Sequence, residues 1–151
     1  MTQYQYNSTD LVRPTELTER EEFLLKESKT FCIYPWIHLH AYPTGEVYPC
    51  CHAEMGVGQV GNCRTNTLKE IWNNPKQRQL RLDMLSETPN PACGRCYEQE
   101  ASGFFSGRKS ANKHHGHHIR EIYTTDDTGA NDGFAMTYWD IRFSNLCNLS
   151  C

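Results

Sequence analysis

The sequence predicts an α+β fold in which a short β-hairpin is combined with several helices and followed by one further strand. Two runs that favour strands, residues 37–42 and 46–51, flank a Pro-Thr-Gly turn, and this arrangement is typical of a hairpin. Two Thr-x-x-Glu sequences, at 18–21 and 67–70, are capping boxes that start helices. The aromatic run 134–143 predicts the further strand.

Three helices are expected in the first part of the chain. The first capping box begins a helix over about residues 18–28, and the second begins a short helix that turns Ile71 inward. A third helix starts with Asn74 as the N-cap and Pro75 at the first helical position. We expect it to run to about Ser86, where a proline-rich stretch follows.

Composition places the chain among soluble proteins. It has 151 residues, of which 15 are basic and 18 acidic, so its net charge is −3. Nucleic-acid-binding domains are usually strongly basic, which argues against that class. No apolar run approaches the roughly 18 residues of a membrane span, and the polar N-terminus does not resemble a signal peptide. We therefore expect a cytoplasmic protein with no nucleic-acid or membrane partner.

The cysteine content points to metal binding. Hydrophobic residues make up 38% of the chain, which predicts a small core that needs a further source of stability. There are eight cysteines, and disulfides are rare in a reducing cytoplasm. Metal ligation is therefore the better interpretation, and a bound metal stabilises a fold because its binding free energy adds to the folding free energy.

Four of the cysteines form a candidate metal centre. Cys32 precedes the hairpin and Cys50 follows it, so pairing of the two strands brings these residues together. Cys93 and Cys96 form a C-x-x-C pair, whose tight turn presents both sulfurs to one metal. The set supplies the four thiolates that either a tetrahedral zinc ion or a cubane iron–sulfur cluster needs. The spacing alone leaves the choice between them open.

The alternative for any of these residues is a free cysteine that packs as a small hydrophobe. The C-x-x-C spacing argues against a free-cysteine interpretation of Cys93 and Cys96. For Cys32 considered alone, a free buried cysteine would be the favoured interpretation. We favour it for Cys51 and Cys63, which have no partner at a ligand spacing. Because adjacent side chains of a strand point to opposite faces, only one of Cys50 and Cys51 should face the site.

Histidines are further candidate ligands. Four of them form a tract: His114, His115, His117 and His118. We interpret this tract as a solvated loop, since no regular element is expected there to fix the rings. His38 and His40 alternate on one strand face and His52 follows Cys51, but four cysteines already complete a site, so we do not expect these histidines to bind metal. The tryptophans are expected in the core: Trp36, Trp72 and Trp139.

The spacing of the cysteines resembles a known family. Cys32 is followed after twelve residues by Gly45-x-x-x-x-Cys50, which resembles the opening of the SPASM/twitch auxiliary-cluster pattern. The pair Cys93-x-x-Cys96 is similar to the one that completes the single auxiliary [4Fe–4S] cluster of twitch domains. The resemblance covers about residues 31–105. It implies that these four cysteines hold an auxiliary [4Fe–4S] cluster.

A second resemblance lies at the end of the sequence. Residues 140–151, DIRFSNLCNLSC, look like the strand and the first two cysteines of the radical S-adenosylmethionine (SAM) motif, C-x-x-x-C-x-x-C. The third cysteine of that motif would fall three residues after Cys151. The resemblance implies a second [4Fe–4S] cluster that Cys147 and Cys151 help to bind, and SAM as a cofactor. We therefore expect the N-terminal, truncated part of a radical SAM enzyme, inactive by itself.

The resemblance implies an activity for the parent enzyme. It would reductively cleave SAM and abstract hydrogen from a peptide or small-molecule substrate, with a reductant such as flavodoxin or ferredoxin. The sequence identifies neither the catalytic residues nor the substrate. The competing hypothesis is a zinc-stabilised binding module that uses the same four cysteines and has no catalytic role.

These interpretations divide the chain into four segments. Residues 1–30 form a tail and a short helix, and residues 31–105 form the twitch-like auxiliary iron–sulfur domain. The polar segment 106–133 is expected to be a linker or a long surface loop. Residues 134–151 begin the radical SAM barrel, and they are long enough for only its first strand.

Overall fold

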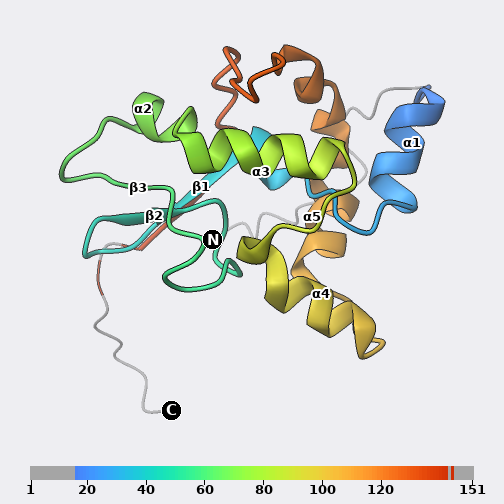
Figure 1. The fold of residues 1–151 in the computed structure, drawn as a ribbon, viewed down its shortest axis with the longest axis horizontal. Helices are drawn as coiled ribbons and strands as arrows, with labels where there is room; N and C mark the ends of the chain where they lie inside the picture. Colours follow the sequence, from blue (N-terminus) through green and yellow to red (C-terminus); the bar gives the residue numbers. More distant parts are fainter. Residues whose placement is uncertain (1–15, 143, 145–151) are drawn as a thin grey trace, which may run out of the picture.

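The computed structural model describes residues 16–142 and residue 144. Within that part of the chain the fold is a mixture of one small four-stranded sheet and several short helices (Figure 1). The α+β class expected from the sequence is confirmed at this level. No helix in the described residues has both the length and the apolar character needed to cross a membrane.

The sheet has the strand order β3-β2-β1-β4. Its strands are β1 (His38–Ala41), β2 (Glu46–Tyr48), β3 (Gly61–Asn62) and β4 (Tyr138–Ile141). Strands β1 and β2 form the expected antiparallel hairpin. Strand β4 pairs with β1 in parallel, with His38 opposite Tyr138 and His40 opposite Asp140.

The hairpin turn depends on one glycine. Gly45 has a φ of +99°, which L-residues with a side chain rarely adopt. A Cβ atom at this position would also lie 2.6 Å from Oδ1 of Asn62, in β3. A glycine is therefore required for the close approach of β3 to the turn.

The three helices expected from their caps are present. They are α1 (Glu19–Lys26), α2 (Leu68–Trp72) and α3 (Pro75–Leu85). Both capping boxes are formed, by Thr18 and by Thr67, and the Asn74 side chain accepts a hydrogen bond from the Lys76 N–H at the start of α3. These short polar signals fixed the helix starts because each satisfies backbone N–H groups that the first helical turn leaves unpaired.

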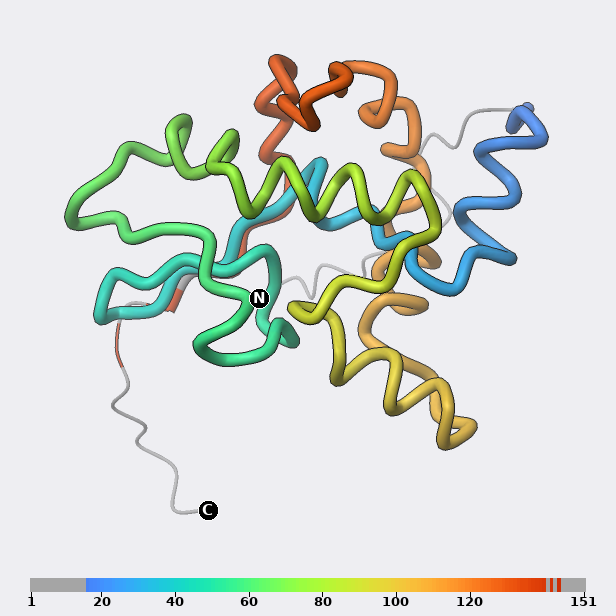
Figure 2. Tube along the Cα trace, in the orientation of Figure 1, coloured from blue at the N-terminus to red at the C-terminus, as the bar shows by residue number. Residues whose placement is uncertain are grey.

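Several further helical segments were not expected from the sequence. They are the 3₁₀ turns η1 (Tyr34–Trp36) and η2 (Pro91–Cys93), helix α4 (Gly94–Ala101), helix α5 (Gly107–His115) and the 3₁₀ segment η3 (Gly116–Thr124). The prediction of a linker or surface loop over 106–133 is wrong for α5 and η3. Figure 2 shows this stretch running beside α1, and Ile119 and Ile122 are buried.

Buried polar side chains explain why α5 looked like a loop in the sequence. Arg108 is 4% exposed and donates to the carbonyl oxygens of Phe31 (2.8 Å) and Ser28 (3.0 Å). Asn112 donates to the Phe31 carbonyl and accepts from the Ile33 N–H, both at 3.0 Å. The segment is held by polar contacts to the main chain, so it lacks the apolar periodicity by which a packed helix is usually recognised.

The core has two parts. The first lies among α1, η1, α3, α5 and η3 and includes Trp36, and the second joins the sheet to α2 and includes Trp72. The expectation that Trp139 is buried is wrong: this residue is 51% exposed. It belongs to β4, the outer strand of the sheet, and no further strand covers it within the described residues.

Candidate metal centre

The hairpin and the preceding turn position the first two cysteines. Cys32 lies just before η1, and Cys50 follows the end of β2 by two residues. Antiparallel pairing of β1 with β2 folds the chain back, so both residues reach the same small cavity. Ten residues line this cavity: Cys32, Tyr34, Cys50, His52, Ala53, Ala92, Cys93, Cys96, Gly107 and Arg108.

The second pair of cysteines comes from the start of a helix. Asn90 caps η2 by accepting from the Ala92 N–H at 3.0 Å, and Cys93 is then the N-cap residue of α4. Cys96 lies in the first turn of that helix. The positive end of a helix dipole stabilises thiolates, so the C-x-x-C pair is both aimed at the cavity and electrostatically suited to metal binding.

Burial changes the acidity of these thiols. Cys32 and Cys96 are 6% and 5% exposed. Removal from water raises the pKa of Cys32, and the neighbouring Cys50 raises it further. Burial, followed by the proximity of Cys96, raises the pKa of Cys93 to about 12. Four thiolates gathered at this cavity would therefore repel one another unless a cation lay between them, and their chemistry fits a thiophilic metal or an iron–sulfur cluster.

The comparison with protein families agrees with this geometry. Residues 32–97 match the family model named SPASM, described as an iron–sulfur cluster-binding domain. This segment is similar to a SPASM domain. All four cysteines that line the cavity lie within the matched segment. The resemblance to SPASM/twitch proteins seen in the sequence is thereby confirmed. No curated protein and no solved structure matched the chain.

Helix α5 contributes to the cavity although it lies outside the SPASM match. Burial raises the pKa of the Cys96 thiol, and the backbone N–H groups of Arg108 and Gly107, at the start of α5, oppose that increase. A Cβ atom at Gly107 would lie 2.9 Å from Nδ1 of His52, so the helix can approach this closely only with a glycine there. This contribution is not visible in the sequence, because the polar segment 106–133 resembles a linker.

Arg108 places a positive charge beside the SPASM cysteines, the name used below for Cys32, Cys50, Cys93 and Cys96. Its guanidinium forms an ion pair with Glu100 of α4, in which Nε lies 2.9 Å from Oε1. The same charge opposes the increase in the pKa of Cys93. Arg108 therefore ties α5 to α4 and lowers the electrostatic cost of gathering thiolates in the cavity. No spacing motif marks this residue in the sequence.

Cys51 and Cys63 do not line the cavity. The Cys51 sulfur lies 3.3 Å from Nδ1 of His52, and Cys63 is exposed. Of the residues that could have replaced a cysteine ligand, His52 lines the cavity, whereas His38 and His40 lie elsewhere on the sheet. Cys147 and Cys151, the candidate ligands of a second cluster, lie outside the described residues.

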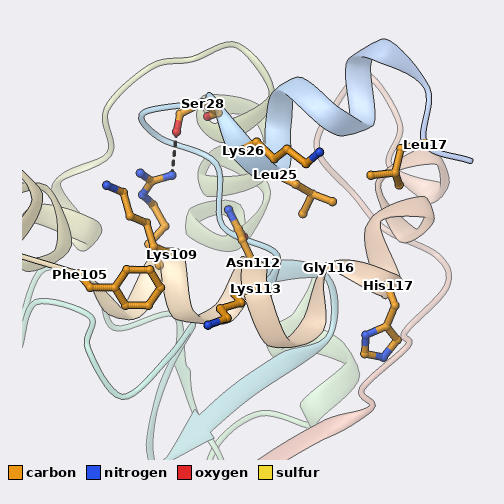
Figure 3. Close-up of a pocket in the computed structure, with 11 residues that line it drawn as sticks. Leu17, Leu25, Lys26, Ser28, Phe105, Lys109, Asn112, Lys113, Gly116 and His117 are labelled. Atoms are coloured by element: carbon orange, nitrogen blue, oxygen red, sulfur yellow. Dashed lines mark hydrogen bonds between the residues drawn. The ribbon is translucent and has the colours of Figure 1, made fainter. Parts of the chain in front are cut away.

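A separate hollow of about 500 Å³ lies between α1 and α5 (Figure 3). Leu17 and Leu25 form part of its wall, and Lys109 and Lys113 of α5 line another part. None of the cysteines in the described part of the chain lines this hollow. It is therefore distinct from the metal centre, although Arg108 contributes to both cavities.

Proposed function

We propose that the SPASM domain of this chain holds one [4Fe–4S] cluster, with one iron bound by each of Cys32, Cys50, Cys93 and Cys96. The observation that carries this proposal is the convergence of these four sulfurs, from three separate stretches of chain, on one small cavity inside the SPASM match. When bound, such a cluster supplies one-electron chemistry. The chain itself would position the thiolates and keep water from them.

The surrounding residues would set the electrostatic environment of the site. The N–H groups at the start of α5 and the Arg108 guanidinium both stabilise negative charge on sulfur. Hydrogen bonds to the sulfurs and burial are the main protein contributions to the reduction potential of a cluster. We therefore assign to α5 the role of tuning the site that the SPASM segment forms.

We further propose that the chain is the N-terminal part of a radical SAM enzyme, for which this cluster is auxiliary. Support comes from the resemblance of residues 140–151 to the radical SAM motif. Cys147 and Cys151 would provide two of the three thiolates of the SAM cluster, and β4 would be the first strand of the barrel. The enzyme would cleave SAM reductively and abstract hydrogen from a peptide or small molecule, with electrons from a flavodoxin or ferredoxin.

Zinc is the competing occupant of the four-cysteine site. Structural zinc sites are closed and tetrahedral, and four cysteines are one of their common ligand sets. The four cysteines that line the cavity would supply that ligand set. In that case the domain would be a stabilised binding module without catalysis.

Metal analysis of the anaerobically purified chain distinguishes these functions. We expect about four irons and four acid-labile sulfides per chain, as a cubane requires. One zinc ion without sulfide would contradict the cluster and leave the binding module. Incubation of the same sample with SAM and a strong reductant, followed by an assay for 5′-deoxyadenosine, tests the enzymatic part.

A further inference from the structure

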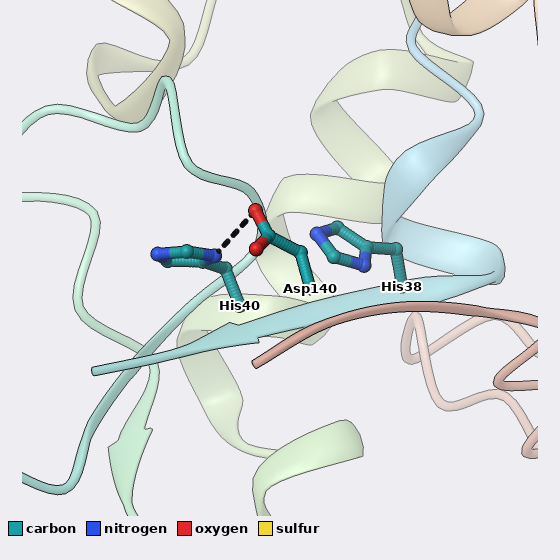
Figure 4. A group of neighbouring side chains, drawn as sticks. All are labelled: His38, His40 and Asp140. Carbon is teal, nitrogen blue, oxygen red and sulfur yellow. Dashed lines mark ion pairs between the residues drawn. The ribbon is translucent and has the colours of Figure 1, made fainter. Parts of the chain in front are cut away.

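Strands β1 and β4 bring three potential metal ligands together on one face of the sheet. His38 and His40 are two residues apart on β1, so they point to the same face. Asp140 of β4 lies opposite His40 in the parallel register. Figure 4 shows the three side chains rising from the same side of these two strands. One ligand atom from each residue lies within 4.8 Å of the others.

His40 has unsatisfied nitrogens in a buried position. Its side chain is fully buried, and neither ring nitrogen has a hydrogen-bond partner among the described residues. Nδ1 lies 2.9 Å from Oδ2 of Asp140, but the contact lacks the direction of a hydrogen bond. A buried polar atom without a hydrogen bond is costly, and neither ring nitrogen of His40 makes one, although Nδ1 lies close to the Asp140 carboxylate. A cation bound by both groups would satisfy the buried nitrogen and the carboxylate together.

His38 is oriented in the way that metal-binding histidines usually are. It is 1% exposed, and its Nδ1 lies 2.9 Å from the carbonyl oxygen of Tyr138. Because a carbonyl can only accept, Nδ1 carries the proton and Nε2 keeps a free lone pair. Metal-ligating histidines almost always donate their second ring N–H in this manner.

We propose that His38, His40 and Asp140 bind one divalent transition-metal ion at a site separate from the SPASM cysteines. Two imidazoles and one carboxylate suit zinc, ferrous iron or cobalt, and they suit neither an all-oxygen calcium site nor a thiolate site. Ligand atoms about 2.0–2.2 Å from one ion lie no more than about 4.4 Å apart. The three ligand atoms lie within 4.8 Å of one another, so small side-chain shifts would bring them to binding distance. The Asp140 side chain is 31% exposed, which provides an entry path.

The two metal sites are close neighbours in the fold. Tyr34 lines the cysteine cavity, and its ring packs against the His38 ring with centroids 5.0 Å apart. Tyr138, whose carbonyl orients His38, stacks on the same tyrosine at 5.5 Å. An ion held by His38 would therefore lie one aromatic ring away from the SPASM cysteines.

The test uses the full chain with its cysteine site already loaded, so that the thiolates are occupied. Cobalt(II) is added without oxygen, and its visible absorption and the cobalt content per chain are measured. We expect one cobalt ion beyond the metal already present. Asp140→Asn should weaken cobalt binding by at least about tenfold, since the substitution removes an anionic ligand. The matched control, Asp132→Asn, changes an exposed carboxylate elsewhere and should bind as the unchanged chain does.

Two further variants address the other histidines and the fold. His40→Ala should abolish cobalt binding, and unchanged iron and sulfide content would show that this variant still folds. His114→Ala, in the histidine tract, should bind cobalt normally. Equal affinity in Asp140→Asn and the unchanged chain, or loss of binding in His114→Ala, would overturn the proposal. The chain could also prove to bind only zinc at its cysteines while its cobalt binding still depends on Asp140. That result would support the site at His38, His40 and Asp140 and would refute the iron–sulfur function.

Discussion

The two candidate metal sites are built in different ways. The four SPASM cysteines lie within residues 32–96, on turns and at a helix start, and their spacing is visible in the sequence. The second site joins His38 and His40 to Asp140, a hundred residues further along, and exists only because β4 pairs with β1 in one particular register. The comparison shows that motif spacing reveals sites made by local turns, whereas sites made by sheet topology require the fold.

The two sites also differ in the protonation chemistry of their ligand groups. Burial raises the pKa of the thiols, and burial lowers the pKa of His38 to about 4. Both shifts favour the neutral form of the side chain at pH 7. A metal ion would replace protons at the thiols, but at the imidazoles it would occupy a lone pair that is already free. Metal binding at the cysteines should therefore depend more steeply on pH near neutrality.

The largest expected effect is the loss of one cysteine ligand. Cys93→Ala should remove the metal from the SPASM site and destabilise the loaded chain by several kcal/mol, because metal binding contributes to folding. Iron and sulfide analysis, together with thermal unfolding, measures both effects. Cys63→Ala is the control, since Cys63 is exposed and does not line the cavity. Full iron content in Cys93→Ala would refute the ligand assignment.

The next effect concerns the contact of α5 with the cysteine site. Arg108→Met removes the partner of Glu100 and leaves the Phe31 and Ser28 carbonyls without their donor. Breaking a buried ion pair in this way costs about 3–5 kcal/mol. Urea unfolding measures the loss, and Lys109→Met, whose side chain is 48% exposed, should change stability little. Similar midpoints for the two variants would show that α5 does not stabilise the fold through Arg108.

A third prediction concerns acid stability at the second site. The pKa of His38 is about 4 in the folded chain and 6.5 ordinarily, so the unfolded chain binds a proton first as the pH falls. The stability that the neutral ring contributes is present above pH 6.5 and is lost between 6.5 and 4. At the lower limit the loss is about 3 kcal/mol.

Urea unfolding of the metal-free chain from pH 7 to pH 4 measures this loss. His38→Asn removes the titrating ring but keeps a donor toward the Tyr138 carbonyl, so its stability should vary less over the same range. An identical pH dependence in the variant would assign the acid sensitivity to other groups.

The smallest expected effect is alkaline destabilisation of the metal-free cysteine site. Cys93 has a pKa of about 12 when folded, against 9.0 ordinarily. The stability that the neutral Cys93 thiol contributes is therefore fully present below pH 9. It is lost as the pH rises toward 12, and the free energy of unfolding falls by about 1.4 kcal/mol per pH unit. Unfolding of the metal-free chain at pH 8 and pH 10 measures this slope. The metal-loaded chain should lack it, and equal slopes would indicate that Cys93 does not bind the metal.

Much of the local structure was predictable from short polar signals. Thr18, Thr67 and Asn74 marked three helix starts, and the turn at Gly45 marked the hairpin. Each signal acts through hydrogen bonds or backbone geometry within a few residues, so it can be seen without knowledge of the fold. The predicted cysteine ligands are also visible from local sequence signals, because their spacing follows from the hairpin turn and the helix start.

The remaining features depend on contacts between distant residues. Helix α5 resembled a loop because Arg108 and Asn112 are buried against main-chain carbonyls rather than among apolar side chains. Trp139 was expected in the core, but its exposure depends on the position of β4 at the edge of the sheet. The cluster of His38, His40 and Asp140 was missed because alternation on one strand does not reveal which residue of another strand lies opposite.

The parallel pairing of β1 with β4 has a consequence for the order in which the protein forms during synthesis. All four SPASM cysteines have been added once residue 96 is made, whereas Asp140 follows about forty residues later, roughly two to nine seconds at ribosomal rates of about 5–20 residues per second. Contacts across such long sequence separations also close slowly. The cysteines proposed as cluster ligands are therefore synthesised before the outer strand that docks on β1.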